Sequence, residues 1–272
     1  MKNFWTLFFL CICTIANAQF DEEELEVIYI DKLSRSQIEQ VITNVRNKTY
    51  KNYVNNTHDY EVTHKAVLND TLTLVDSKEL YEVAIFFANK KINKSIKSHP
   101  NNKNEINRAF FERYSFNDSP MYWLTEFVIR KYVNVPDLDF LNNFGEYQFQ
   151  RSYEKDLVRI DFYSDDMYEG YFTFDKNYNL KEVSFYLLHP YPIDHSQTKN
   201  GKKMFTKNWK YTKEKVSILF ELNTQNKLVI KEMKAEEQIT DYNFQRFNAK
   251  RELLLEDKNL NFKTELLFKA KR

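Results

Sequence analysis

Apolar and polar residues alternate along much of this chain, which is the period of a β-strand with one buried face. The alternation begins at Tyr60, passes through Val62, His64 and Ala66, and ends at a turn of Asn and Asp that leads into a returning strand. From residue 145 onward, short turns separate further strand-like segments: 145–153, 156–164, 167–175, 180–188, 207–222, 227–240, 248–257 and 260–269. The pattern predicts a long antiparallel meander.

Two stretches interrupt this pattern and predict loops. Residues 89–107 are rich in Lys and Asn and have Ser98-His99-Pro100 in their middle. Residues 190–208 contain two prolines and few apolar positions, and they could separate two halves of one sheet.

Two other segments have the spacing of a helix. Residues 35–48 place apolar side chains on one face, behind a capping box formed by Ser36 and Glu39. Residues 120–133 start with Pro120, directly after the candidate N-cap Ser119, and are apolar over more than half of the helix circumference. Such a helix packs on two sides or covers a cavity. The candidate residues for covering an apolar ligand are Trp123, Leu124, Phe127 and Val128.

These elements predict an α+β fold: a large, curved, antiparallel sheet resembling a half-barrel, with the N-terminal helix and the second apolar helix packed on it. The aromatic share of 16% suits a wide curved interior, and the three glycines favour curvature without tight closure. Residues 19–272 are expected to form one domain.

The first eighteen residues have the three parts of a secretory signal peptide. Lys2 precedes a short apolar run, and Ala16-Asn17-Ala18 matches a cleavage site. We expect cleavage after Ala18 and a periplasmic or cell-envelope location, the alternative being an uncleaved anchor. Cleavage removes Cys11 and Cys13, the two cysteines of the chain, so the mature protein would contain neither a disulfide nor a thiol nucleophile.

Part of the sequence resembles a bacterial family. Residues 25–34, followed by Ser36-Gln37-Ile38-Glu39-Gln40-Val41-Ile42 and Thr49-Tyr50-Lys51-Asn52-Tyr53, resemble a junction in exported carboxypeptidase-like regulatory-domain-containing proteins. The run 168–183 is similar to a hairpin of their C-terminal β region, a pattern shared with lipoprotein-carrier-like half-barrels. The regulatory domain itself is absent or reduced to its last strand. The resemblance implies the sheet topology and an envelope location, and it implies no functional residue.

Composition and motifs exclude several chemistries. The hydrophobic share of 42% and the charged share of 29% argue against a disordered chain and against a polytopic membrane protein, and the net charge of +1 gives no global attraction for nucleic acid. No H-E-x-x-H, G-x-S-x-G or phosphate-binding loop is present. Residues 175–186 lack the Gly and Glu of a calcium loop and predict an Asn-rich turn. The sequence therefore predicts no catalytic residue, no metal site and no cofactor.

The most distinctive polar feature is a basic segment between residues 199 and 215, in which aromatic residues are interleaved. Cations beside amphipathic rings suit an anionic membrane surface. The candidates are Lys202, Lys203, Lys207, Trp209 and Lys210. The alternative is a solvated hairpin whose lysines protect an edge strand from aggregation.

Three functions follow as hypotheses. The first is a non-enzymatic envelope protein that binds an apolar or lipid-like ligand, with the helix at 120–133 as its cover. The second is a structural or partner-binding module with a solid core. The third is a hydrolase whose site has no recognised motif.

Overall fold

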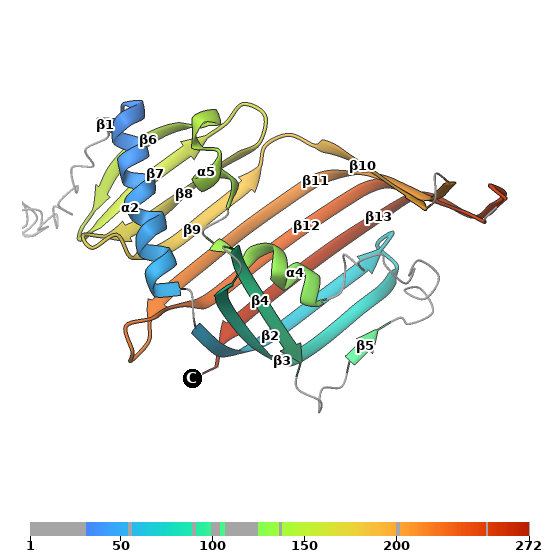
Figure 1. The fold of residues 1–272 in the computed structure, drawn as a ribbon, viewed down its shortest axis with the longest axis horizontal. Coiled ribbons are helices and arrows are strands. Elements are labelled where there is room, and N and C mark those ends of the chain that lie inside the picture. Colours follow the sequence, from blue (N-terminus) through green and yellow to red (C-terminus); the bar gives the residue numbers. More distant parts are fainter. Residues whose placement is uncertain are drawn as a thin grey trace, which may run out of the picture.

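One antiparallel sheet makes up most of the computed structural model, which describes residues 31–53, 56–88, 91–98, 104–106, 125–135, 138–199, 202–248 and 250–271 (Figure 1). Every strand pairing within it is antiparallel. The described strands are β1 (Asp31–Lys32), β2 (Asn56–Leu68), β3 (Leu72–Ala88), β4 (Lys91–Ser98), β5 (Asn104–Ile106), β6 (Gln148–Glu154), β7 (Leu157–Tyr163), β8 (Tyr168–Asp175), β9 (Leu180–Leu187), β10 (Tyr191–Lys199), β11 (Lys202–Leu222), β12 (Leu228–Phe247) and β13 (Leu253–Ala270).

The order of the strands is not that of a simple meander. Across the sheet it runs β1-β6-β7-β8-β9-β11-β12-β13-β2-β3-β4, while β10 pairs with β11 and β5 pairs with β3. The last strand of the chain, β13, therefore lies beside β2, and Leu266 is opposite His64. The α+β class and the large curved antiparallel sheet are confirmed, and the return of β13 to the N-terminal hairpin is the feature that the strand pattern alone did not predict.

Helices cover one face of this sheet, which we call the helix-covered face; we call the opposite face the open face. Helix α2 (Arg35–Tyr53), helix α4 (Thr125–Tyr132) and helix α5 (Asp139–Asn142), followed by the 3-10 turn η2 (Phe144–Glu146), all lie on the same side (Figure 1). Helix α2 buries one stripe at helical spacing: Ile38, Ile42, Val45, Thr49 and Tyr53. No described helix is both long enough and apolar enough to cross a bilayer.

The predicted N-terminal helix is confirmed, but it starts from a different cap. The backbone amide of Ser34 donates to Gln37 Oε1 at 2.8 Å, and the backbone amide of Gln37 donates to Ser34 Oγ at 3.4 Å. This capping box lies two residues before the predicted pair of Ser36 and Glu39. Both pairs fit the motif, and the helix begins at Arg35, directly after Ser34.

Both predicted loops contain strands, and those predictions were wrong. Strands β4 and β5 fall within residues 89–107 and pair with β3, and β10 falls within residues 190–208 and pairs with β11. Lys and Asn are uncommon in strands, yet neighbouring strands supply the backbone partners here, and Ile96 is buried. The two strands predicted at 248–257 and 260–269 form a single strand, β13, which begins only at Leu253.

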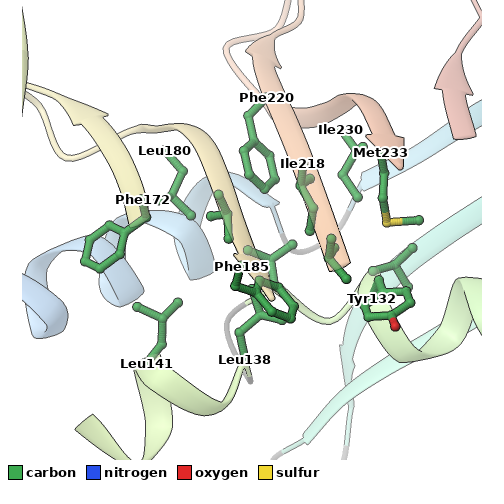
Figure 2. Close-up of a cluster of buried hydrophobic side chains, with 14 of the residues drawn as sticks. Tyr132, Leu138, Leu141, Phe172, Leu180, Phe185, Ile218, Phe220, Ile230 and Met233 are labelled. Atoms are coloured by element: carbon green, nitrogen blue, oxygen red, sulfur yellow. The ribbon is translucent and has the colours of Figure 1, made fainter. Parts of the chain in front are cut away.

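The main core lies between the sheet and helices α2, α4 and α5, and it combines aromatic and aliphatic side chains (Figure 2). Phe140 of α5 stacks on Phe162 of β7 with their ring centroids 4.0 Å apart, and Phe172 of β8 lies 6.0 Å from Phe140. The expected Asn-rich turn after β8 is confirmed, because Asp175 Oδ1 accepts the amides of Asn177 and Asn179 at 2.9 and 3.0 Å.

Candidate functional site

A group of charged and hydroxyl side chains is buried where α4 meets the sheet; we call it the charged cluster, and it consists of Lys131, Tyr132, Tyr168, Glu214 and Glu237. Glu214 of β11 and Glu237 of β12 are direct cross-strand neighbours. Strand alternation turns both carboxylates to the helix-covered face, because the next positions on the same face are the buried Val216 and Ala235.

The two residues of α4 in the cluster contact both carboxylates. Lys131 Nζ lies 2.9 Å from Glu214 Oε1 and 2.7 Å from Glu237 Oε1. The Tyr132 hydroxyl lies 2.9 Å from Glu214 Oε1 and also within hydrogen-bond distance of Glu237 Oε1. Since a hydroxyl has one proton, Tyr132 donates to one carboxylate at a time. From β8, the Tyr168 hydroxyl donates to Glu214 Oε2 at 2.9 Å.

Burial and charge fix the protonation states of Lys131 and Tyr132. The Glu214 and Glu237 side chains are only 2% and 8% exposed, and that of Lys131 is 35% exposed. Desolvation alone would lower the pKa of Lys131, but the carboxylates of Glu237 and Glu214 outweigh it and raise that pKa above its ordinary value. Burial, followed by the same two carboxylates, raises the pKa of Tyr132. Lys131 is therefore a cation and Tyr132 a neutral donor.

A second polar contact joins the start of α4 to the sheet. His64 Nδ1 of β2 lies 2.8 Å from the Thr125 hydroxyl, and the His64 side chain is fully buried. Desolvation lowers the pKa of His64 to about 4, against an opposing effect of Glu237, so the ring is neutral at pH 7. Within the described part of the chain, His64 Nε2 and the Oγ of its cross-strand neighbour Ser77 have no hydrogen-bond partner.

Beyond the charged cluster, the helix-covered face carries a second apolar group that we call the aromatic cluster. Its rings come from the long strands β11, β12 and β13. The ring centroids of Trp209 and Tyr242 are 5.9 Å apart, and those of Tyr242 and Phe262 are 5.3 Å apart. The ring centroids of Phe205 and Phe244 are 6.2 Å apart. The remaining members are Ala66, Leu68, Leu74, Val75 and Ile239, all buried. The aromatic cluster is separate from the main core. The two glutamates of the charged cluster, Glu214 and Glu237, lie on β11 and β12 nearer to that core.

The candidate cover residues fall largely outside the described part of the chain. Trp123 and Leu124 lie outside it. The backbone of Phe127 and Val128 belongs to α4, inside the predicted helix at 120–133, but their side chains are not among those described. Their role as a cover stays a prediction.

The structure places the described members of the basic candidate patch on different faces. Lys207 and Trp209 are buried on the helix-covered face, and the Lys207 ammonium lies 4.9 Å from the Phe205 ring. Desolvation lowers the pKa of Lys207 to about 8. Lys210 is exposed and pairs with Asp241 at 3.2 Å. Lys202 and Lys203 belong to β11, and their side chains are outside the description. Binding to an anionic membrane surface stays a prediction.

The sequence contains a signal for the charged cluster in the alternation of two strands. Glu214 begins a series of alternate positions that continues with Val216, Ile218 and Phe220. Glu237 similarly falls between Ala235 and Ile239. An acidic residue at the buried period of a strand needs a cationic or hydroxyl partner, which here comes from a helix about 80 to 110 residues earlier in the chain.

The chemistry of the charged cluster suits holding a helix in place. Its carboxylates already accept hydrogen bonds from Lys131, Tyr132 and Tyr168, and they lie beneath α4. Among the described residues, no three histidine, cysteine or acidic side chains gather as metal ligands.

The class that fold and site define is an open antiparallel sheet with a helix held over it by buried charges. Comparison with protein-family models, curated proteins and solved structures finds no match to this chain.

Proposed function

We propose that this protein is a non-enzymatic binding protein of the cell envelope that takes an apolar or lipid-like ligand between its sheet and helix α4. The observation that carries this proposal is the aromatic cluster, a second apolar region that lies on the helix-covered face apart from the main core. The predicted signal peptide and the resemblance to half-barrel carriers support the location.

The contacts of α4 support its role as a movable cover. Lys131 and Thr125 meet the sheet through an ion pair and a hydrogen bond, and both can be replaced by water when the helix lifts. A buried ion pair adds little net stability, because desolvation offsets much of the attraction. Helix α2 instead buries Ile38, Ile42 and Val45, and moving it would expose apolar surface. Among the described side chains, α4 buries Ile129 and Tyr132, fewer than α2 buries, so we infer that α4 has the smaller opening free energy.

The chemistry of the aromatic cluster selects the ligand class. Its surface is made of rings and aliphatic side chains, so the gain on binding comes from removing hydrocarbon from water. Each buried methylene contributes about 0.8 kcal/mol, so an acyl chain gains affinity with its length. In the conformation described here the cluster is closed. Thr125 at the start of α4 contacts His64, which lies two positions before Ala66 of the cluster on β2, so we take a movement of α4 as the route by which a ligand enters.

The test joins α4 to the sheet and measures uptake of an uncharged fluorescent dye, N-phenyl-1-naphthylamine. His64→Cys and Thr125→Cys replace two side chains that are in contact, in a chain where Cys11 and Cys13 are changed to Ser. We expect the unlinked protein to take up the dye, a reducible thiol cross-linker to abolish uptake, and reduction to restore it. Native mass spectrometry of the unmodified protein should show bound lipid.

The matched control is Lys213→Cys with Glu236→Cys, joined by the same reagent. Lys213 Nζ lies 2.5 Å from Glu236 Oε2, and the two residues are diagonal neighbours on β11 and β12, on the open face. Linking it should leave uptake unchanged. Equal uptake by the linked and unlinked His64–Thr125 variants would contradict the proposal, as would absence of both dye uptake and bound lipid.

A structural or partner-binding module is the second candidate, and the packing of the main core favours it. Phe140, Phe162 and Phe172 fill the space between α5 and β6–β9 without help from a ligand. If the dye and mass-spectrometry experiments both give no binding, this second function takes precedence, and affinity capture from envelope extracts becomes its test.

A further inference from the structure

The open face of strands β6–β9 carries a hollow that the function proposed above does not use. It has a volume of about 440 Å³ and lies across the strands on the side away from the helices. We call it the tyrosine hollow. Its main lining side chains are Gln148, Asp161, Tyr163, Glu169, Tyr171 and Tyr186. That volume is within the range of small-molecule sites.

Strand register places these side chains in two adjacent rows. Gln148, Tyr163, Glu169 and Tyr186 are successive cross-strand partners, so the two tyrosines stand on either side of one carboxylate. The next row on the same face contains Gln150, Asp161 and Tyr171. Tyr163 and Tyr186 are 40% and 43% exposed. Rings of this size on a sheet surface are available for contact with a ligand.

A hydrogen-bond network holds the polar groups in place. Arg159 donates two hydrogen bonds to Asp161 Oδ1, from Nε at 3.0 Å and from Nη2 at 2.8 Å. The guanidinium also lies 3.7 Å from the centre of the Tyr171 ring, and the Tyr171 hydroxyl donates to Glu182 at 2.6 Å. The Tyr186 hydroxyl is hydrogen bonded to Glu169. These contacts fix the side chains before any ligand arrives, which lowers the entropy lost on binding.

The charges around the hollow narrow the class of ligand. Arg159 is the cation of the network, and Asp161 and Glu154 already pair with it. Glu169 and Glu182 add negative charge nearby. An anionic ligand would be repelled, and a purely apolar one would leave carboxylates and amides without partners. A quaternary ammonium group would suit rings and carboxylates but would leave the amides of Gln148 and Gln150 without partners.

We propose that the tyrosine hollow binds a neutral saccharide chain. A sugar ring presents C–H groups that pack on the electron-rich face of a tyrosine. Its hydroxyl groups both donate and accept, which matches the amides of Gln148 and Gln150 and the carboxylates of Asp161 and Glu169. The site is independent of the apolar ligand proposed above, because it lies on the opposite face of the sheet.

Isothermal titration calorimetry with four soluble hexasaccharides, of cellulose, starch, chitin and xylan type, tests this proposal. We expect one of them to bind with a Kd below about 1 mM. Tyr163→Ala and Tyr186→Ala should each weaken that binding at least tenfold, whereas Tyr186→Phe keeps the ring and should lose less. Circular dichroism of each variant establishes that the sheet is retained.

The control variant is Tyr153→Ala. Tyr153 is 45% exposed, close to Tyr163 and Tyr186, but its cross-strand partner Val158 packs against the main core, so it belongs to the other face. Its replacement should leave saccharide affinity unchanged. The proposal is overturned if none of the four saccharides binds, if Tyr153→Ala weakens binding as much as Tyr186→Ala, or if choline binds at this site and the saccharides do not.

Discussion

At the scale of single residues, this protein places ionisable groups at positions where the strand pattern calls for apolar ones. Glu214, Glu237 and His64 each occupy an inward position and each is buried. The two glutamates have a cation and hydroxyl donors as partners, whereas His64 avoids the cost of a buried charge by staying neutral. For His64 the consequence is a pH dependence of stability that can be measured.

The first prediction concerns His64 and the pH dependence of stability. Because burial lowers its pKa from 6.5 to about 4, the unfolded chain takes up a proton before the folded one does. The stability that the neutral ring contributes is complete above pH 6.5 and is lost as the pH falls toward 4. Between pH 7 and 4.5 the loss is about 2 kcal/mol.

His64→Asn keeps a polar atom near Nδ1 and cannot be protonated. We expect urea unfolding of this variant to show a smaller loss of stability between pH 7 and 4.5 than the wild type shows, by about 2 kcal/mol. Other groups titrate in the same range in both proteins, so the difference between them isolates His64. Identical losses would mean that His64 is protonated equally readily in the folded and unfolded states.

The second prediction concerns Gly170 in β8. A Cβ at this position would collide with the carbonyl oxygen of Ser184 and lie 2.7 Å from the Cα of Phe185, which are backbone atoms of β9. Gly170→Ala should therefore destabilise the fold by about 2 kcal/mol or more, although alanine generally suits a strand better than glycine. Gly145→Ala meets only the flexible end of Arg35 at 3.4 Å and should be nearly neutral in the same thermal or urea unfolding experiment.

At the scale of elements, the two longer helices are attached to the sheet by different physics. Helix α2 uses an apolar stripe, which its sequence period predicts directly. Helix α4 combines buried apolar residues such as Ile129 with the ion pair of Lys131. Apolar stripes are visible in a sequence, whereas an ion pair between segments far apart in the chain is not.

The third prediction follows from the attachment of α4. Lys131→Met leaves Glu214 and Glu237 buried without their cation, so α4 should open more often and its amides should exchange with deuterium about tenfold faster or more. The amides of α2 should be unaffected. Global stability should fall by about 1–3 kcal/mol, less than for a fully buried pair because the Lys131 side chain is 35% exposed.

Lys213→Met is the matched control for this experiment. Lys213 and Glu236 directly neighbour Glu214 and Glu237 along the strands but form an ion pair on the open face, with both side chains about half exposed. Loss of this exposed ion pair should change the free energy of unfolding by less than about 1 kcal/mol, and the rate of deuterium exchange at the α4 amides should stay the same. Equal effects of the two substitutions would show that the buried position of the Lys131 pair is unimportant.

At the scale of the whole molecule, the sheet is completed by its last strand. β13 lies between β12 and β2, so it joins the N-terminal hairpin to the rest of the sheet. Phe262 is opposite Leu68, and Phe268 is opposite Val62. Contacts between residues so far apart in the chain form late, because closing the intervening loop carries a large entropy cost.

The fourth prediction is that the sheet does not form without β13. A chain that ends at Asn248 leaves the edges of β12 and β2 unpaired and their apolar faces exposed, so it should aggregate or show no cooperative unfolding by circular dichroism. A chain that ends at Ala270 keeps β13 and should unfold cooperatively. Native amide protection of β6–β12 in the shorter chain would contradict the central role of β13.

The sequence by itself determined the class of fold, most of the strands and the stripe of α2, because these depend on local periodicity and on turn residues such as Asn69 and Asp70, both with positive φ. The tertiary structure alone decided that β13 pairs with β2, that Lys- and Asn-rich segments become strands, and that Lys131 reaches Glu214 and Glu237. The physical reason is distance along the chain. A pairing between remote segments depends on how the whole sheet packs, and no local pattern of residues encodes it.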